Sequence, residues 1–292
     1  LITDRNGAVL AENITTTSLV VVPNQIKDKE TTARKLSEIL NTNYEDMLAH
    51  LTKKTSIERI HPEGRKLSFD IADKINSLNF DGVYLLKESK RNYPYKNLLS
   101  HVLGYVGIDN QGLSGIELQY DNYLKGEDGS IKYYSDGFGK KLEKATIYNS
   151  PQSGMNVALT IDINIQEAIE NELDNVVTKY NPQQALIVVA NPKTGEIYGM
   201  SSRPNFNPNE YSKYNLETIN RNLPIFNTYE PGSTFKVITL ASSIQEKTIN
   251  LFEDKYYDSG FINISGSRIK CWKHGGHGAQ TFLQVVQNSC NL

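Results

Sequence analysis

The segment YEPGSTFKVITLASS, residues 229–243, joins a turn to an apolar run, and it decides how the rest of the chain is interpreted. Its Pro-Gly pair favours a bend. The apolar residues from Phe235 onward are so closely spaced that they predict a buried helix. Ser233 and Lys236 stand three positions apart at the start of this helix. That spacing places them on one face, with about 5–6 Å between their Cβ atoms.

These two residues allow two interpretations. In the first, Ser233 is a nucleophile and Lys236 is its base, because burial disfavours a charged lysine and a neutral amine can accept the serine proton. In the second, Ser233 is an ordinary helix cap and Lys236 extends to solvent. The segment alone leaves both open.

A second Ser-x-x-Lys pattern, Ser267 to Lys270, lacks these surroundings. It lies in a Gly/Ser-rich turn and an expected strand, so neither a buried helix nor a helix N-terminus accompanies it. We therefore favour Ser233 over Ser267 as the candidate nucleophile.

The end of the chain supplies a second element. Thr281 and Gln284 form a capping-box pattern before an apolar helix. Ser289-Cys290-Asn291 follows this helix. Ser-x-Asn, found after Ser-x-x-Lys in this order, is typical of penicillin-recognising serine acyl transferases.

With these motifs the sequence resembles the class B penicillin-binding proteins, which are monofunctional D,D-transpeptidases of peptidoglycan synthesis. The residues SHVLGYVG and CWKHGGHG favour the elongation-type penicillin-binding protein 2 branch, and division or sporulation paralogues stay open. The resemblance runs nearly end to end, through residues 4–13, 91–107, 112–129, 159–166, 192–200, 229–236 and 287–291.

The resemblance implies a role for each motif residue. Ser233 would be the acylated nucleophile, with its backbone N–H as half of the oxyanion hole, and Lys236 would be its base. Ser289 would relay the proton to and from the leaving amine, and Asn291 would hydrogen-bond the donor peptide. β-Lactams would acylate Ser233, and the chemistry would require no cofactor.

The family's third element, Lys-Ser/Thr-Gly on a later strand, does not follow Asn291 here. The Lys193-Thr194-Gly195 that is present precedes the nucleophile and occupies an expected hairpin turn, so we interpret it as structural. We expect these 292 residues to be C-terminally incomplete and to be completed by a following segment.

The predicted architecture has two domains. Residues 1–150 are expected to form an α+β non-catalytic domain, of the pedestal or dimerisation kind. Residues 151–292 would form the N-terminal part of an α/β transpeptidase domain with a mixed sheet and flanking helices. Helical spacing predicts helices at 31–40, 44–51, 69–78 and 165–176. Strands are predicted at 18–23, 83–86, 156–162, 185–190 and 196–200, and 126–153 is expected to be a hairpin or linker.

A metal site is also possible in the loop before the final helix. Cys271, His274 and His277 are spaced three apart around a flexible Gly-Gly pair, and Asp258 could complete a tetrahedral zinc shell. The alternative is an ordinary loop in which these side chains pack and form hydrogen bonds.

The charge of the chain excludes one class of function, and the resemblance implies a substrate and partners. The net charge of −2 and the lack of a basic run exclude a typical nucleic-acid-binding protein. The resemblance implies a stem pentapeptide as substrate, a membrane glycosyltransferase as partner, and an upstream single-pass membrane helix that holds these domains on the extracytoplasmic side.

Two alternatives to a transpeptidase stay open. One is a hydrolase, such as a carboxypeptidase or β-lactamase, and the other is a non-catalytic β-lactam sensor or assembly scaffold that retains the fold.

Overall fold

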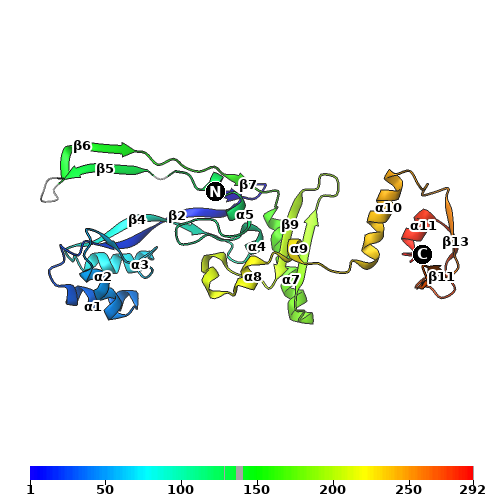
Figure 1. Ribbon diagram of the computed structural model, residues 1–292, viewed down its shortest axis with the longest axis horizontal. Helices are drawn as coiled ribbons and strands as arrows, with labels where there is room; N and C mark the ends of the chain where they lie inside the picture. Colours follow the sequence, from blue (N-terminus) through cyan, green and yellow to red (C-terminus); the bar gives the residue numbers. More distant parts are fainter. Residues whose placement is uncertain (128, 136–140, 292) are drawn as a thin grey trace. The chain divides into compact units, whose positions relative to one another are not determined.

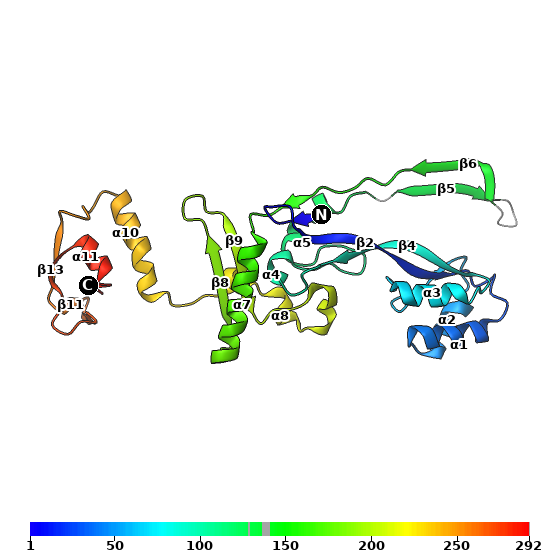
Figure 2. The ribbon, with the colours of Figure 1, turned by 180° about the vertical axis from the view of Figure 1, so that it is seen from behind.

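The computed structural model describes residues 1–127, 129–135 and 141–291. The chain divides into two compact units, Leu1–Asn227 and Thr228–Leu292. Figures 1 and 2 show the elements of each unit, which are described separately below. Within the described residues, no helix has both the length and the apolar character that crossing a membrane requires.

The first unit is built on a long antiparallel pair of strands. β2 (Val9–Val21) pairs with β4 (Val83–Asn92), from Glu12 opposite Asn92 to Val21 opposite Val83. The short β3 (Glu58–Arg59) pairs with the end of β2. The strand predicted at 18–23 is thus confirmed as the end of a much longer strand.

Three helices cover one face of this pair (Figures 1 and 2). They are α1 (Lys29–Leu40), α2 (Tyr44–Thr52) and α3 (Phe69–Ser77), which confirms the three helices expected there. Each begins at a side chain that accepts a backbone N–H, namely Asp28, Asn43 and Ser68. Their apolar faces close a core that includes Leu19, Val21, Ala33, Leu36, Met47, Leu51, Ile60 and Ile75.

A second core joins the start of the chain to residues far along it. β1 (Ile2–Thr3) pairs in parallel with β7 (Val157–Ala158) and antiparallel with β2, so the five-stranded sheet is mixed. Ile2 and Leu10 are fully buried here. Three short helices border this core, α4 (Ser100–Leu103), α5 (Gly115–Gln119) and α6 (Asp121–Leu124).

An antiparallel pair of strands follows these helices, in the region 126–153 for which a hairpin or linker was expected; residues 128 and 136–140 of it lie outside the described residues. β5 (Ser130–Ser135) pairs antiparallel with β6 (Lys141–Asn149). The domain boundary expected near residue 150 stays a prediction, since the first unit continues through this region to Asn227.

The rest of the first unit packs a helix on a hairpin. α7 (Ile163–Tyr180), capped by Asp162, lies against β8 (Ala185–Ala190) and β9 (Ile197–Arg203). Lys193-Thr194-Gly195 lies in the turn between the two strands, as expected. The unit ends with η1 (Pro208–Lys213), α8 (Leu216–Asn220) and α9 (Leu223–Phe226).

The second unit is small and contains both predicted motifs. It comprises η2 (Gly232–Phe235), α10 (Lys236–Gln245), β10 (Lys255–Asp258), β11 (Phe261–Ile264), β12 (Ser267–Lys270), β13 (Gly278–Thr281) and α11 (Phe282–Gln287). β10 pairs with β13, and β11 forms a hairpin with β12.

The prediction that α10 is buried is wrong for this unit. None of its residues is buried, and Val237 and Ile238 are 63% and 56% exposed. Its one extensive neighbour among the described elements is η2, which leads directly into it. The apolar composition that predicted burial is real, but residues 228–291 supply no sheet to cover it.

Candidate active site

The Ser-x-Asn motif sits on a turn that ends α11. Thr281 and Gln284 form the predicted capping box at the start of this helix. At its end, the Ser289 N–H bonds the carbonyl of Val286 and the Cys290 N–H bonds that of Val285. This pair of bonds defines a Schellman motif, in which the residue at the Ser289 position adopts a left-handed conformation.

Ser289 has the φ of 48° that this motif requires. Glycine normally takes such a position, because an L side chain is strained there. Strain of this kind is of order 1–3 kcal/mol and persists where the surroundings enforce it. Ser289 is one of ten described non-glycine residues with a positive φ, so its contacts rather than its conformation must show what its hydroxyl does.

Lys236 is the first residue of α10, and its side chain contacts the Ser-x-Asn motif. Its Nζ lies 2.8 Å from the Ser289 carbonyl oxygen, 3.2 Å from Ser289 Oγ and 2.9 Å from Asn291 Oδ1. Three oxygen acceptors match the three N–H donors of an ammonium group. The alternative in which Lys236 merely extends to solvent is therefore wrong.

Ser233 lies in η2, one turn before Lys236, and is exposed. Ser233 is not an N-cap, because Pro231 is the N-cap of η2 and Phe235 is that of α10, so the alternative that it is a plain helix cap is not supported either. The Lys236 backbone N–H donates to the Ser233 carbonyl, but among the described residues no hydrogen bond joins the Ser233 hydroxyl to Lys236 Nζ. The structure therefore brings three of the four predicted catalytic residues into direct contact and leaves Ser233 nearby in sequence, with an accessible side chain.

The competing Ser267 and Lys270 lie at the two ends of β12, whose residues are all exposed. The Lys270 carbonyl accepts a bond of 3.4 Å from Asn291 Nδ2, which is a backbone role that any residue could fill. Among the described residues no hydrogen bond joins the Lys270 amine to Ser289, whereas the Lys236 amine contacts it.

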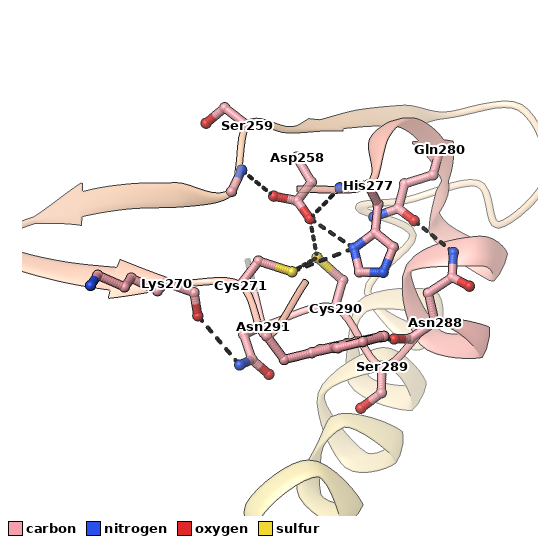
Figure 3. A network of polar contacts seen from close by, with 12 residues as sticks. Asp258, Ser259, Lys270, Cys271, His277, Gln280, Asn288, Ser289, Cys290 and Asn291 are labelled. Atoms are coloured by element: carbon pink, nitrogen blue, oxygen red, sulfur yellow. Dashed lines mark hydrogen bonds and ion pairs between the residues drawn. The ribbon is translucent and has the colours of Figure 1, made fainter. Parts of the chain in front are cut away.

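Behind the motif, four side chains of metal-binding types converge (Figure 3). The ligand atoms of Asp258, Cys271, His277 and Cys290 all lie within 4.8 Å of one another. Cys271 Sγ is 3.4 Å from His277 Nδ1 and 3.9 Å from Cys290 Sγ. Asp258 Oδ2 is 2.8 Å from His277 Nδ1 and 3.3 Å from Cys290 Sγ.

The predicted ligand set needs one correction. His274 is exposed and is not a member of this group, whereas Cys290 is. Ligand spacing along one loop suggested His274, but α11 and its Schellman turn carry Cys290 back over that loop. The available signal was that the chain has two cysteines and that one is the middle residue of Ser-x-Asn.

The group is electrostatically suited to a cation. Asp258 is 1% exposed. Burial alone would raise its pKa, but hydrogen bonds from the Cys271 side chain, the Gly260 and His277 N–H groups and the His277 ring hold the pKa of this carboxyl well below its ordinary value. Asp258 is thus an anion held among soft donors.

The donor set fits zinc. Two sulfurs, one imidazole nitrogen and one carboxylate oxygen are the ligands of tetrahedral zinc sites. Ligands about 2.0–2.3 Å from a central ion lie about 3.3–3.8 Å apart in a tetrahedron. Four of the atom pairs are 2.8 to 3.9 Å apart and all pairs lie within 4.8 Å, so the side chains would have to shift by about 1 Å or less to reach that range.

Two protein-family models match the chain. Residues 1–159 match the Penicillin-binding Protein dimerisation domain, and residues 185–292 match the Penicillin binding protein transpeptidase domain. The order of the two matches confirms the predicted fold class of a dimerisation-type domain followed by a transpeptidase domain.

Curated relatives are similar over most of the chain. Stage V sporulation protein D of Bacillus subtilis (strain 168) is 50% identical over 291 residues, which cover 99% of this chain and 45% of that protein. The probable peptidoglycan D,D-transpeptidase PenA of Neisseria gonorrhoeae is 31% identical over 256 residues, covering 86% of this chain and 44% of that protein. The chain spans about half the length of the curated relatives it matches.

Among solved structures, a complex between penicillin-binding protein 2 and MreC from Helicobacter pylori matches with a TM-score of 0.76 and 23% identity. The match covers 99% of this chain and 58% of that one. At this identity the likeness supports the fold alone.

Proposed function

Because the chain belongs to the penicillin-binding proteins that combine a dimerisation and a transpeptidase domain, we propose that it is part of a peptidoglycan D,D-transpeptidase with Ser233 as its nucleophile. The observation that carries this proposal is the contact of Lys236 with Ser289 and Asn291, which are 53 and 55 residues away in the sequence. An ordinary helix start has no need of such a contact.

The proposed reaction has two steps. Ser233 Oγ attacks the carbonyl of the terminal D-Ala–D-Ala amide, and its proton passes to Lys236 Nζ. The amide C–N bond then breaks, and the proton reaches the departing D-Ala amine through the Ser289 hydroxyl. In the second step an amine of a neighbouring strand attacks the acyl-enzyme, loses its proton along the same route, and returns Ser233 to its hydroxyl form.

Lys236 needs one adjustment to serve as the base. A neutral amine has two N–H donors and one lone pair, so it must release one of its three acceptors. The Ser289 hydroxyl, at 3.2 Å, is the longest of the three contacts and is the one that Lys236 would release. The lone pair would then be free to accept the Ser233 proton, which Lys236 would pass on to the Ser289 hydroxyl.

Transpeptidation is distinguished from its alternatives by its products. The full-length protein, given a stem pentapeptide and an acceptor amine, is expected to release D-Ala and to form the cross-linked peptide. Ser233→Ala should form neither, and Ser267→Ala should match the unaltered protein. Release of D-Ala without cross-linked product would indicate a hydrolase. Penicillin acylation without peptide turnover would indicate a sensor, and neither activity in a folded protein would indicate a scaffold.

We also propose that the group of Asp258, Cys271, His277 and Cys290 binds a structural zinc ion. The support is the donor set, the convergence of its atoms and the anionic carboxylate. In this role the ion would hold the loop before β13 against the Ser-x-Asn turn. It would take no part in the chemistry of acyl transfer.

The zinc proposal is tested by elemental analysis of protein purified in metal-free buffer. One zinc per chain is expected, and Cys290→Ser should weaken binding more than about 100-fold, beyond the effect of losing an outer-shell partner. His274→Gln is the matched control, since its ring is outside the group. Protein without stoichiometric zinc, or equal losses in both variants, would remove the proposal.

The biological setting is proposed from the relatives. The 50% identity to a protein named for sporulation favours the sporulation paralogue that the sequence left open over the elongation branch. An upstream membrane helix, an extracytoplasmic location, a glycosyltransferase partner and a later Lys-Ser/Thr-Gly strand remain proposals that rest on family resemblance.

A further inference from the structure

Trp272 is an exposed aromatic side chain held in one orientation beside the catalytic motif. Its ring is 64% exposed, yet its indole Nε1 donates a 2.9 Å hydrogen bond to the carbonyl oxygen of Asn288. The ring also packs edge-on against His277, with 5.3 Å between the centroids. An exposed tryptophan fixed at two points is an unusual use of a large apolar surface.

The carbonyl that Trp272 holds belongs to the peptide bond that leads into Ser289. The orientation of this peptide bond determines the φ of Ser289, which at 48° is left-handed. On the other side of Ser289, the Cys290 thiol donates a hydrogen bond to the Asp258 carboxylate. Figure 3 shows Cys290 directed into the metal-binding group and the Ser289 hydroxyl directed away from it.

A strained residue stays in its conformation only where its neighbours enforce it. The Schellman bonds fix the backbone N–H groups of Ser289 and Cys290, but they leave the Asn288 carbonyl without a helical partner. The indole N–H of Trp272 supplies that partner. Ser289 therefore presents its carbonyl and hydroxyl to Lys236 from a turn that is held on both sides.

We propose that Trp272 is a positioning residue for acyl transfer, which acts through the Asn288 carbonyl to hold Ser289 in the conformation that meets Lys236. This proposal rests on the proposed transpeptidase function. Trp272 acts on Ser289 through the backbone and takes no part in proton transfer.

The test measures acylation of the full-length protein by a penicillin, with the binding and acylation steps resolved by stopped-flow kinetics. Trp272→Phe keeps an aromatic ring and removes the N–H donor. We expect its acylation rate constant to fall about fivefold to tenfold, as the loss of one hydrogen bond predicts, while the dissociation constant of the initial complex changes less than twofold. Tyr257→Phe is the matched control, because Tyr257 is 70% exposed and its hydroxyl makes no hydrogen bond among the described residues.

A double-mutant cycle separates positioning from a general structural effect. Glycine adopts the left-handed conformation without help, so Trp272→Phe should have almost no effect in a Ser289→Gly background, however slow that background is. An equal loss in both backgrounds would overturn the proposal, as would a wild-type rate in the single variant. If instead the unaltered protein and Tyr257→Phe were not acylated at all, the proposed function itself would fail.

Discussion

Lys236 Nζ lies 2.8 Å from the carbonyl oxygen and 3.2 Å from the hydroxyl oxygen of Ser289, a residue 53 positions further along the chain. The start of α10 and the end of α11 are thereby joined through one amine. The two sequence motifs are short and individually weak, and it is this contact that makes them a single site.

Replacing Lys236 by arginine tests whether its amine is the base. A guanidinium keeps the positive charge and can occupy the same oxygen acceptors, but it does not deprotonate in proteins. We therefore expect the penicillin acylation rate of the full-length protein to fall by about 10²–10⁴-fold, the usual contribution of a general base. Lys270→Arg, at the competing motif, should leave the rate unchanged. A Lys236→Arg variant that acylated at the normal rate would assign the base to another group.

Breaking the buried ion pair that joins α7 to β9 should destabilise the first unit. Arg203 Nη1 lies 2.7 Å from Glu170 Oε2, and both side chains are 10% exposed. Glu170→Ala would leave a buried guanidinium without its main partner, so we expect a loss of about 3–5 kcal/mol in the free energy of unfolding.

Asp174 provides the matched control, because it also pairs with Arg203 at 2.7 Å but its side chain is 66% exposed. Asp174→Ala should lower the free energy of unfolding by less than about 1 kcal/mol. Urea denaturation followed by circular dichroism measures both. Equal losses in the two variants would show that burial does not determine how much each ion pair contributes to the free energy of unfolding.

His101 should make the stability of the first unit depend on pH. Its Nε2 lies 2.8 Å from the Thr218 carbonyl and its Nδ1 3.4 Å from Ser202 Oγ, as suits a neutral ring that donates to one and accepts from the other. Burial lowers the pKa of His101 below its ordinary value, and the Thr218 carbonyl offsets this only in part. The stabilisation of the folded state by the neutral His101 ring is thus complete above the unfolded-state pKa of about 6.5. It is lost as the pH falls through that value toward the folded-state pKa.

The measurement is the thermal midpoint between pH 8 and pH 5. His101→Gln keeps a donor for Thr218 and removes the titration, so its midpoint should fall less steeply over this range than that of the unaltered protein. His61→Gln, at an exposed ring, should not change the slope. Parallel curves for His101→Gln and the unaltered protein would contradict this account.

Much of the fold could be predicted because its elements follow local patterns. The hairpin of β8 and β9 was visible as two β-rich runs around Asn191-Pro192, and the capping box at Thr281 marked the start of α11. The first half of β2 could not be predicted because residues 12–17, which are polar except for Ile14, lack apolar alternation and are held by pairing with β4.

The site was predictable in its residue types and less so in its geometry. Ser289, Asn291 and Lys236 were identified from motif order, but their contact depends on how two helices are placed. Cys290 was missed as a ligand and His274 was wrongly included, because ligand spacing within one loop does not show which distant turn folds over it. For the same reason, composition could not show that α10 has no sheet over its apolar face in this unit.

The central claim is that Ser233 is the nucleophile, and the intact mass of the full-length protein after incubation with a penicillin tests it most directly. We expect one covalent adduct per chain, absent in Ser233→Ala and retained in Ser267→Ala, with the modified peptide containing residues 229–236. An adduct that persisted in Ser233→Ala, or no adduct on the folded unaltered protein, would contradict the account.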